Sequence, residues 1–291
     1  MTAIPLIPAG SSATAAKGRN MRGKTLPLVA LLGGFLSAPL CLAGALRGIN
    51  AQAANPVSAP PKLSVQDQDQ MEKRADAAYA GKDYATAAPL YRQLADSGRT
   101  GDMNRLGYMY QNGLGLTQSD AQALAWYGRA AGGGNHSAMY NLGVMYENGH
   151  GVARDYARAF AWYRQAAEAG DAGGMANLGF MYEDGRGVAK DVAQAVAWYR
   201  QAAEAGDTKG MTNLGVMYED GRGLAKDVAQ AVAWYRKAAG KGDALGMCFL
   251  GDMYLNGRGV PRDMAQALAW YRKAAALGNE SAKANLKKLG Q

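Results

Sequence analysis

The feature that most constrains this chain is a 15-residue segment that recurs with a period of 36 residues. One copy reads NLGVMYENGHGVARD, and the copies occupy residues 141–155, 177–191, 213–227 and 249–263, with a looser copy at 105–119. Self-similarity at one fixed period is typical of arrays in which each repeat packs only on its neighbours. The sequence therefore predicts an array that grows along one axis, rather than one or two globular domains.

Each repeat has the pattern of two helices joined by a loop, as residues 172–207 illustrate. Met175, Leu178, Gly179 and Tyr182 follow one another at spacings of three, one and three, which places them on one face of a first helix. A second helical segment follows within the same 36 residues. The pattern therefore predicts an all-α fold built from antiparallel helix pairs.

The loop and the second helix carry further local signals. Gly185 and Gly187 tolerate the positive φ found just past a helix C-terminus, and Asp191 offers a side-chain oxygen to the free N–H groups of the next helix. The second helix is rich in alanine, and Trp198 is expected to be its large core anchor. An indole of this kind removes about 150–250 Å² from water when it is buried. The five tryptophans of the chain recur at the repeat period: Trp126, Trp162, Trp198, Trp234 and Trp270.

The period also divides the chain into segments. Residues around Gly81-Lys82-Asp83 have the pattern of one further helix pair, with predicted inward positions Ala75, Ala78, Tyr79, Ala85, Ala88, Leu90 and Tyr91. The predicted organisation is a leader at 1–53, a disordered linker rich in proline and polar residues at 54–70, a degenerate helix pair at 71–99, five repeats at 100–135, 136–171, 172–207, 208–243 and 244–279, and a polar capping helix at 280–291.

The N-terminal segment has the features of a secretory signal peptide. A basic stretch precedes the apolar run of residues 25–46, and Ala51-Gln52-Ala53 has the small-x-small pattern that a signal peptidase accepts. We expect export with cleavage after Ala53, and Met21 would give a leader of more ordinary length. The expected location is the periplasm, with secretion or surface display as alternatives. An apolar run of about 20 residues is also long enough for an uncleaved membrane anchor.

Charge and cysteine content restrict the function further. The formal net charge of +8 is concentrated in residues 1–53, which hold five of the 32 basic residues and no acidic residue. The rest of the chain has 27 basic and 24 acidic residues and no basic face with interleaved aromatic residues, so nucleic-acid binding is not expected. Without the leader, Cys248 is the only cysteine, and one thiol cannot form an internal disulfide.

No pattern in the repeats matches an enzyme or a metal site. His136 and His150 lie on different turns without a cluster of acidic or cysteine ligands, and the other repeats replace His150 with arginine or leucine. The repeated Gly-x-Gly lacks the lysine and hydroxyl residue of a phosphate-binding loop. Neighbouring acids such as Glu183-Asp184 recur in near-identical surroundings, whereas a catalytic pair needs unlike ones. We therefore expect no enzymatic activity, no cofactor and no metal.

The pattern LGxMYxxGxGVxxDxxxAxxWYRxAAxxG closely resembles the Sel-one-like repeat, a 36-residue relative of the tetratricopeptide repeat. The resemblance covers about residues 100–290; residues 71–99 look more like an ordinary tetratricopeptide unit. The resemblance implies a right-handed α-solenoid, or superhelix, that acts as a protein-interaction scaffold. Exported bacterial members of the family are associated with envelope signalling and regulation.

An alternative is a hydrolase-like or cell-wall-ligand-binding repeat protein. The cysteine-rich relatives linked to β-lactam binding carry a cysteine pair in each repeat, which this chain lacks. Departures from the pattern occur at Ser119, Gly128, Phe249 and Asp252.

A stripe of variable positions on the first helices is the predicted partner-binding surface. Positions held constant in every repeat serve packing, whereas variable ones are free to determine specificity, unless they are a neutral surface that has drifted. In tetratricopeptide-like arrays the first helices line the concave face, so this stripe is expected to line a groove. We predict a protein or peptide partner that offers Lys or Arg beside an apolar anchor, because Glu147, Glu183 and Glu219 repeat one position beside aromatic residues. The predicted site consists of Tyr108, Gln111, Tyr140, Val144, Glu147, Phe180, Glu183, Thr212, Val216, Glu219 and Asp252.

Overall fold

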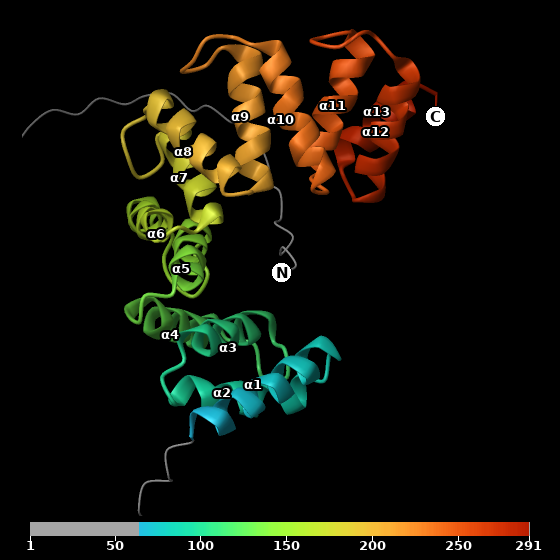
Figure 1. The fold of residues 1–291 in the computed structure, drawn as a ribbon. Helices are drawn as coiled ribbons and strands as arrows, with labels where there is room; N and C mark the ends of the chain where they lie inside the picture. Colours follow the sequence, from blue (N-terminus) through green and yellow to red (C-terminus); the bar gives the residue numbers. More distant parts are fainter. Residues whose placement is uncertain (1–63, 291) are drawn as a thin grey trace, which may run out of the picture. The chain divides into compact units, whose positions relative to one another are not determined.

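The computed structural model describes residues 64–290, so the predicted leader and residues 54–63 of the predicted linker lie outside the described part. The described residues form 13 helices and no strand (Figure 1). None of these helices is both long enough and apolar enough to span a membrane. Their bounds are α1 Val65–Ala80, α2 Tyr84–Asp96, α3 Thr100–Asn112, α4 Asp120–Gly132, α5 His136–Asn148, α6 Tyr156–Glu168, α7 Ala172–Asp184, α8 Val192–Glu204, α9 Thr208–Asp220, α10 Val228–Gly240, α11 Ala244–Asn256, α12 Met264–Ala276 and α13 Glu280–Lys288.

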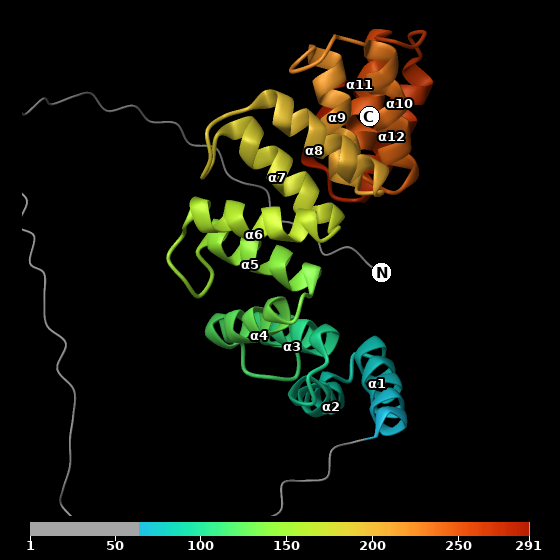
Figure 2. The same ribbon diagram turned by 60° about the vertical axis from the view of Figure 1, so that its left-hand side comes forward.

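Each odd-numbered helix packs against the even-numbered helix that follows it, and each even-numbered helix packs against the next odd-numbered one. Figures 1 and 2 show these pairs following one another in sequence order. Helix α9 also contacts α7 and α11 directly, whereas no comparable contact joins successive even-numbered helices in residues 64–290. From α7 to α11 the odd-numbered helices are therefore more closely spaced than the even-numbered ones. The fold is an all-α repeat solenoid, as the period predicted.

The loop signals of the sequence are confirmed in the repeat at 172–207. Gly185 and Gly187 have φ values of 74° and 70°. The Asp191 carboxylate accepts a 3.0 Å hydrogen bond from the backbone N–H of Gln194 at the start of α8. These residues end one helix and begin the next by local chemistry alone, which explains why their roles are legible from the sequence.

The main aromatic residue of each core is the tyrosine that follows the tryptophan, so the expectation that Trp198 is the anchor is wrong. Tyr199 has no exposed surface and its ring lies against Gly179 of α7, where an added Cβ atom would come within 2.8 Å of the ring. Trp198 is only partly buried, and it packs at the margin of a core cluster that α6 of the preceding repeat and α7 of its own repeat form together. Among the tryptophans only Trp126 is buried, whereas the same tyrosine is fully buried in all five repeats: Tyr127, Tyr163, Tyr199, Tyr235 and Tyr271.

The N-terminal helix pair differs from the prediction at two points. Helix α1 begins at Val65 rather than at Met71, because the Ser64 hydroxyl caps it by accepting a hydrogen bond from the backbone N–H of Asp67. The last six residues of the predicted linker are therefore helical. Ala85 is exposed, and Ala87 takes the buried position on α2.

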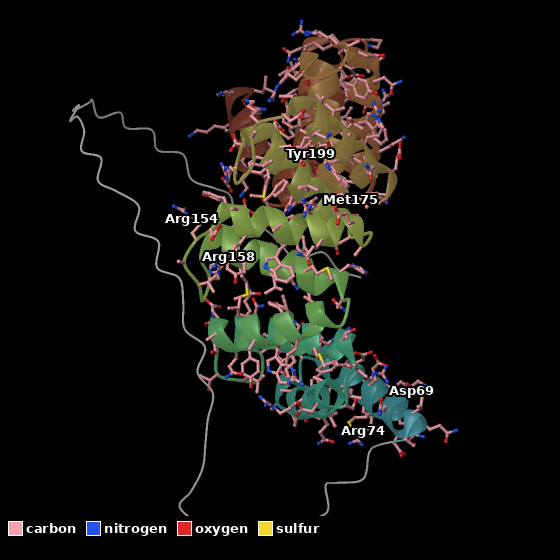
Figure 3. All side chains as sticks on the ribbon, turned by 90° about the vertical axis from the view of Figure 1, so that its left-hand side faces the viewer. Asp69, Arg74, Arg154, Arg158, Met175 and Tyr199 are labelled. Carbon is pink, nitrogen blue, oxygen red and sulfur yellow. The ribbon has the colours of Figure 1, made fainter. Side chains whose placement is uncertain are left out.

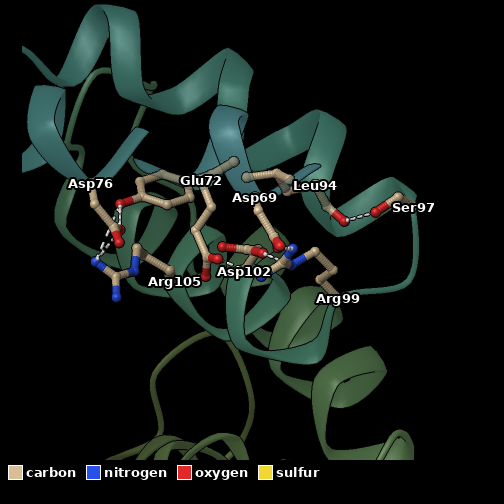
Figure 4. A network of polar contacts seen from close by, with 9 residues as sticks. Asp69, Glu72, Asp76, Leu94, Ser97, Arg99, Asp102 and Arg105 are labelled. Carbon is tan, nitrogen blue, oxygen red and sulfur yellow. Dashed lines mark hydrogen bonds and ion pairs between the residues drawn. The ribbon is translucent and has the colours of Figure 1, made fainter. Parts of the chain in front are cut away.

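A network of charged side chains joins α1 to α3 (Figure 4). The Arg99 guanidinium pairs with Asp69 at 3.0 Å, with Asp102 at 3.1 Å and with Glu72. Burial, together with the neighbouring Glu72 charge, raises the pKa of Asp102 to about 6. Because Arg99 binds carboxylates of both helices, it holds the N-terminal pair against the first full repeat.

At the other end, α13 packs against α12. Leu286 and Leu289 lie partly buried against the last core cluster, and Lys283, Lys287 and Lys288 are exposed. The final helix thus covers apolar surface with one face and presents charge with the other.

Candidate interaction surface

The predicted stripe lies on the odd-numbered helices α3, α5, α7, α9 and α11, of which α7, α9 and α11 contact one another directly. Its members fall into two groups. Six form side-chain hydrogen bonds within the chain: Gln111, Glu147, Glu183, Thr212, Glu219 and Asp252. The other five are partly buried or exposed apolar and aromatic residues: Tyr108, Tyr140, Val144, Phe180 and Val216.

The three glutamates each accept a hydrogen bond from the buried tyrosine of their own repeat. The Tyr163 hydroxyl donates to Glu147 at 2.6 Å, and the Tyr199 hydroxyl donates to Glu183 at 2.6 Å. The same contact joins Tyr235 to Glu219 at 2.9 Å. Burial and the neighbouring carboxylate raise the pKa of each of these tyrosines, so they stay neutral and act as donors.

An arginine from the loop of the following repeat approaches each glutamate. Arg222 lies 2.8 Å from Glu183, Arg186 lies 3.9 Å from Glu147, and Arg258 pairs with Glu219. The carboxylates are mostly buried; Arg222 and Arg258 balance the charges of Glu183 and Glu219, whereas Arg186 lies closer to Asp184, at 2.5 Å, than to Glu147. This ladder of tyrosine, glutamate and arginine therefore links successive repeats, whereas the predicted site treated the glutamates as free surface charges. The available signal was the recurrence of the three arginines at the repeat period.

The ladder changes at both ends of the array. Gln111 accepts the Tyr127 hydroxyl at 2.9 Å, but it carries no charge to attract a loop arginine. The residue at the arginine position of the next repeat is His150, which is exposed and lies 3.9 Å from Asp120. His150 is thus a solvated loop residue that occupies the place of a structural arginine.

In the last repeat an aspartate one helical turn earlier replaces the glutamate. Leu255 stands at the glutamate position, and Asp252 accepts the Tyr271 hydroxyl at 2.6 Å instead. Asn285 of α13 also donates to Asp252, at 3.3 Å. Asp252 therefore takes over the role of the glutamate that is missing at position 255, and it connects the last repeat to α13.

Thr212 does not contribute surface, which corrects its assignment to the predicted site. Its side chain is 1% exposed, and its hydroxyl donates to Asp243 at 3.0 Å. Asp243 is the N-cap residue of α11, whose carboxylate also accepts from the backbone N–H of Gly246. Thr212 therefore stabilises the contact between α9 and α11.

The apolar members leave one residue clearly available to a partner. Phe180 is 37% exposed, and the Arg186 guanidinium lies 4.9 Å from the centre of its ring. Tyr140 is half-buried against Tyr163, with ring centres 5.9 Å apart, and burial raises its pKa to about 12. Phe180 is thus the most exposed aromatic side chain of the stripe.

The described residues contain no group of three or more His, Cys, Asp or Glu side chains that is arranged to hold a metal ion. Cys248 is buried and unpaired. Figure 3 draws the described side chains along the array and labels Tyr199 of α8, Arg154 in the loop before α6 and Arg158 in α6.

The fold and this ladder of repeat contacts define a class of protein, the α-solenoids built from short helix pairs. The Sel1 repeat model matches residues 102–135, 136–171, 172–207, 208–243 and 244–279. The chain therefore belongs to the Sel1 repeat family, whose members are generally protein–protein interaction scaffolds with a typically non-catalytic fold.

Solved structures show the same relationship. A Sel1 repeat protein from Oxalobacter formigenes is 37% identical, with a TM-score of 0.70 over 75% of this chain and 89% of that one. A protective antigen of uropathogenic Escherichia coli is also 37% identical, with a TM-score of 0.61 over 74% of this chain and 50% of that one. An immunity protein from Pseudomonas aeruginosa shares the fold at 19% identity, with a TM-score of 0.53 over 76% of this chain and 86% of that one. No curated protein matches the chain.

Proposed function

We propose that this protein is an exported scaffold that binds a protein or peptide partner on its odd-numbered helices, in signalling or regulation at the cell envelope. The observation that carries the proposal is the row of variable apolar side chains on these helices, with Phe180 exposed among them. Aromatic residues are common anchors of binding energy at protein interfaces. Side chains that differ between repeats are suited to recognising one segment of a partner.

The contacts of the glutamates refine the kind of partner. Glu147, Glu183 and Glu219 already accept from a tyrosine and lie beside a loop arginine. A Lys or Arg of the partner therefore has to share these carboxylates with the chain's own arginines. We propose that an apolar anchor of the partner against Phe180 and Tyr140 supplies most of the affinity, and that any basic residue beside it adds a salt-sensitive contribution.

Truncation of the two aromatic residues is expected to weaken partner binding without unfolding the array. Phe180→Ala and Tyr140→Ala are each expected to cost about 1–3 kcal/mol of binding free energy if they are anchors. The experiment is parallel capture from an envelope fraction, followed by titration of the captured partner. Lys190→Ala is the matched control, because Lys190 is exposed on a loop and has no ion pair in residues 64–290. Equal capture by all variants would place the binding site elsewhere on the protein.

We also propose that the mature protein begins at Ala54, after removal of the leader. The support is the order of a basic stretch, an apolar run and Ala51-Gln52-Ala53 in the sequence. N-terminal sequencing of protein from the envelope fraction is expected to start at Ala54. Recovery of the intact apolar run would instead indicate a membrane anchor.

A further inference from the structure

A second surface lies on the even-numbered helices, at the tryptophans. In three repeats a basic side chain three residues after the tryptophan covers the indole, as neighbouring positions on a helix allow. The distances from the cation to the ring centre are 4.1 Å for Arg129 over Trp126, 3.9 Å for Lys237 over Trp234 and 4.3 Å for Lys273 over Trp270. The chain thus repeatedly places a cation on this face of the indole.

The second and third of the five repeats lack that cation. Three residues after the tryptophan, where the other three repeats have Arg or Lys, these two repeats have Gln165 and Gln201. No Lys or Arg in residues 64–290 lies over either ring. Both indoles are partly exposed, and each packs against a core cluster formed by its own repeat and the preceding one. Each therefore has a fixed ring and no cation of its own upon it.

The same two repeats carry a carboxylate one turn further along the helix. Glu168 and Glu204 stand where the other repeats have Gly132, Gly240 and Ala276. Glu204 is exposed without an ion pair among the described residues, and Glu168 has only an exposed contact with Arg164 at 3.7 Å. Across these two positions α6 and α8 therefore each carry one negative charge, where α4, α10 and α12 each carry one positive charge. Arg164 and Arg200 lie between these positions and the tryptophans on the same helices.

We propose that this face of α6 and α8 binds a basic segment of a partner protein, which places a Lys or Arg side chain over each uncovered indole. The surface is defined by Trp162, Gln165, Glu168, Trp198, Gln201 and Glu204. Cations are attracted to the face of an indole by its quadrupole, and Glu204 supplies the opposite charge nearby. The contacts at Trp126, Trp234 and Trp270 show within the same molecule that the geometry accepts a cation.

This surface is independent of the stripe on the odd-numbered helices. Because basic residues outnumber acidic ones over the whole chain, a basic segment has no general electrostatic reason to bind it. Attraction of such a segment therefore requires a local site.

The test measures the affinity of the full chain for a fluorescein-labelled deca-lysine peptide. Binding is monitored by the fluorescence anisotropy of the peptide at low salt.

We expect the wild-type chain to bind deca-lysine. The double variant Gln165→Lys/Gln201→Lys is expected to bind the peptide about tenfold more weakly, because its own lysines cover the two indoles. The control Gln194→Lys/Gln230→Lys adds the same charge at other exposed positions of α8 and α10 and is expected to retain affinity within about twofold. Thermal melts establish that both variants are folded.

Three results would overturn the proposal. The first is no binding by the wild-type chain, and the second is equal weakening by both lysine pairs, which would indicate general electrostatics. The third is full affinity in a folded Trp162→Leu/Trp198→Leu variant, which would indicate that the carboxylates act alone. If the tryptophan variant fails to fold, the comparison of the two lysine pairs decides the matter.

Discussion

Replacement of Tyr199 with alanine is expected to lower the free energy of unfolding by about 3–5 kcal/mol, the range observed for large aromatic residues in a core. Tyr199 has no exposed surface, and its ring fills the space left by Gly179 on the facing helix. Its hydroxyl also donates to Glu183, which pairs in turn with Arg222 of the next repeat. The substitution therefore leaves a cavity within one repeat and loosens the contact between two.

Urea denaturation of the wild type and two companion variants measures this effect. Tyr199→Phe keeps the ring and removes only the hydroxyl, so it is expected to cost about 1 kcal/mol. Trp198→Ala is expected to cost less than Tyr199→Ala, because the indole is partly exposed. A larger loss for Trp198→Ala would restore the expectation, based on the sequence alone, that the tryptophan is the anchor of the repeat.

The substitution Gly187→Ala is expected to destabilise the array by about 2–5 kcal/mol. Gly187 has a φ of 70°, a conformation that costs an L-residue roughly 1–2 kcal/mol. An added Cβ atom would also overlap the carbonyl group of Tyr156 and come within 2.8 Å of the Ala157 nitrogen. Both contacts are with backbone at the start of α6, which cannot rotate away as a side chain can. Overpacking of this kind adds about 1–3 kcal/mol.

Gly170→Ala separates the two contributions. Gly170 has a φ of 90°, but an added Cβ atom would meet nothing within 4 Å. This control is therefore expected to show only the conformational cost of about 1–2 kcal/mol. Equal midpoints for the two variants in urea would mean that the close approach between repeats at Gly187 contributes nothing to stability.

Much of the fold could be predicted because its signals are local and repeated. The period of 36 residues predicted the solenoid, and the glycines and aspartate around Gly185, Gly187 and Asp191 predicted where one helix ends and the next begins. Each of these roles depends on backbone conformation or on a hydrogen bond to a residue three positions away. The start of α1 was missed although Ser64 and Asp67 form a comparable local cap, because a composition rich in proline precedes them.

By itself, therefore, the sequence determined the repeat architecture, the helix ends within the repeats and the membership of the Sel1 repeat family. Only the tertiary structure decided which aromatic residue is the anchor, because Trp198 and Tyr199 are adjacent in sequence and differ only in the surface that each one faces. It also decided that the stripe glutamates are partnered, since Arg222 is 39 residues from Glu183 in the chain and 2.8 Å from it in space. Contacts between repeats depend on how one helix pair is placed on the next, and a periodic sequence does not specify that placement residue by residue.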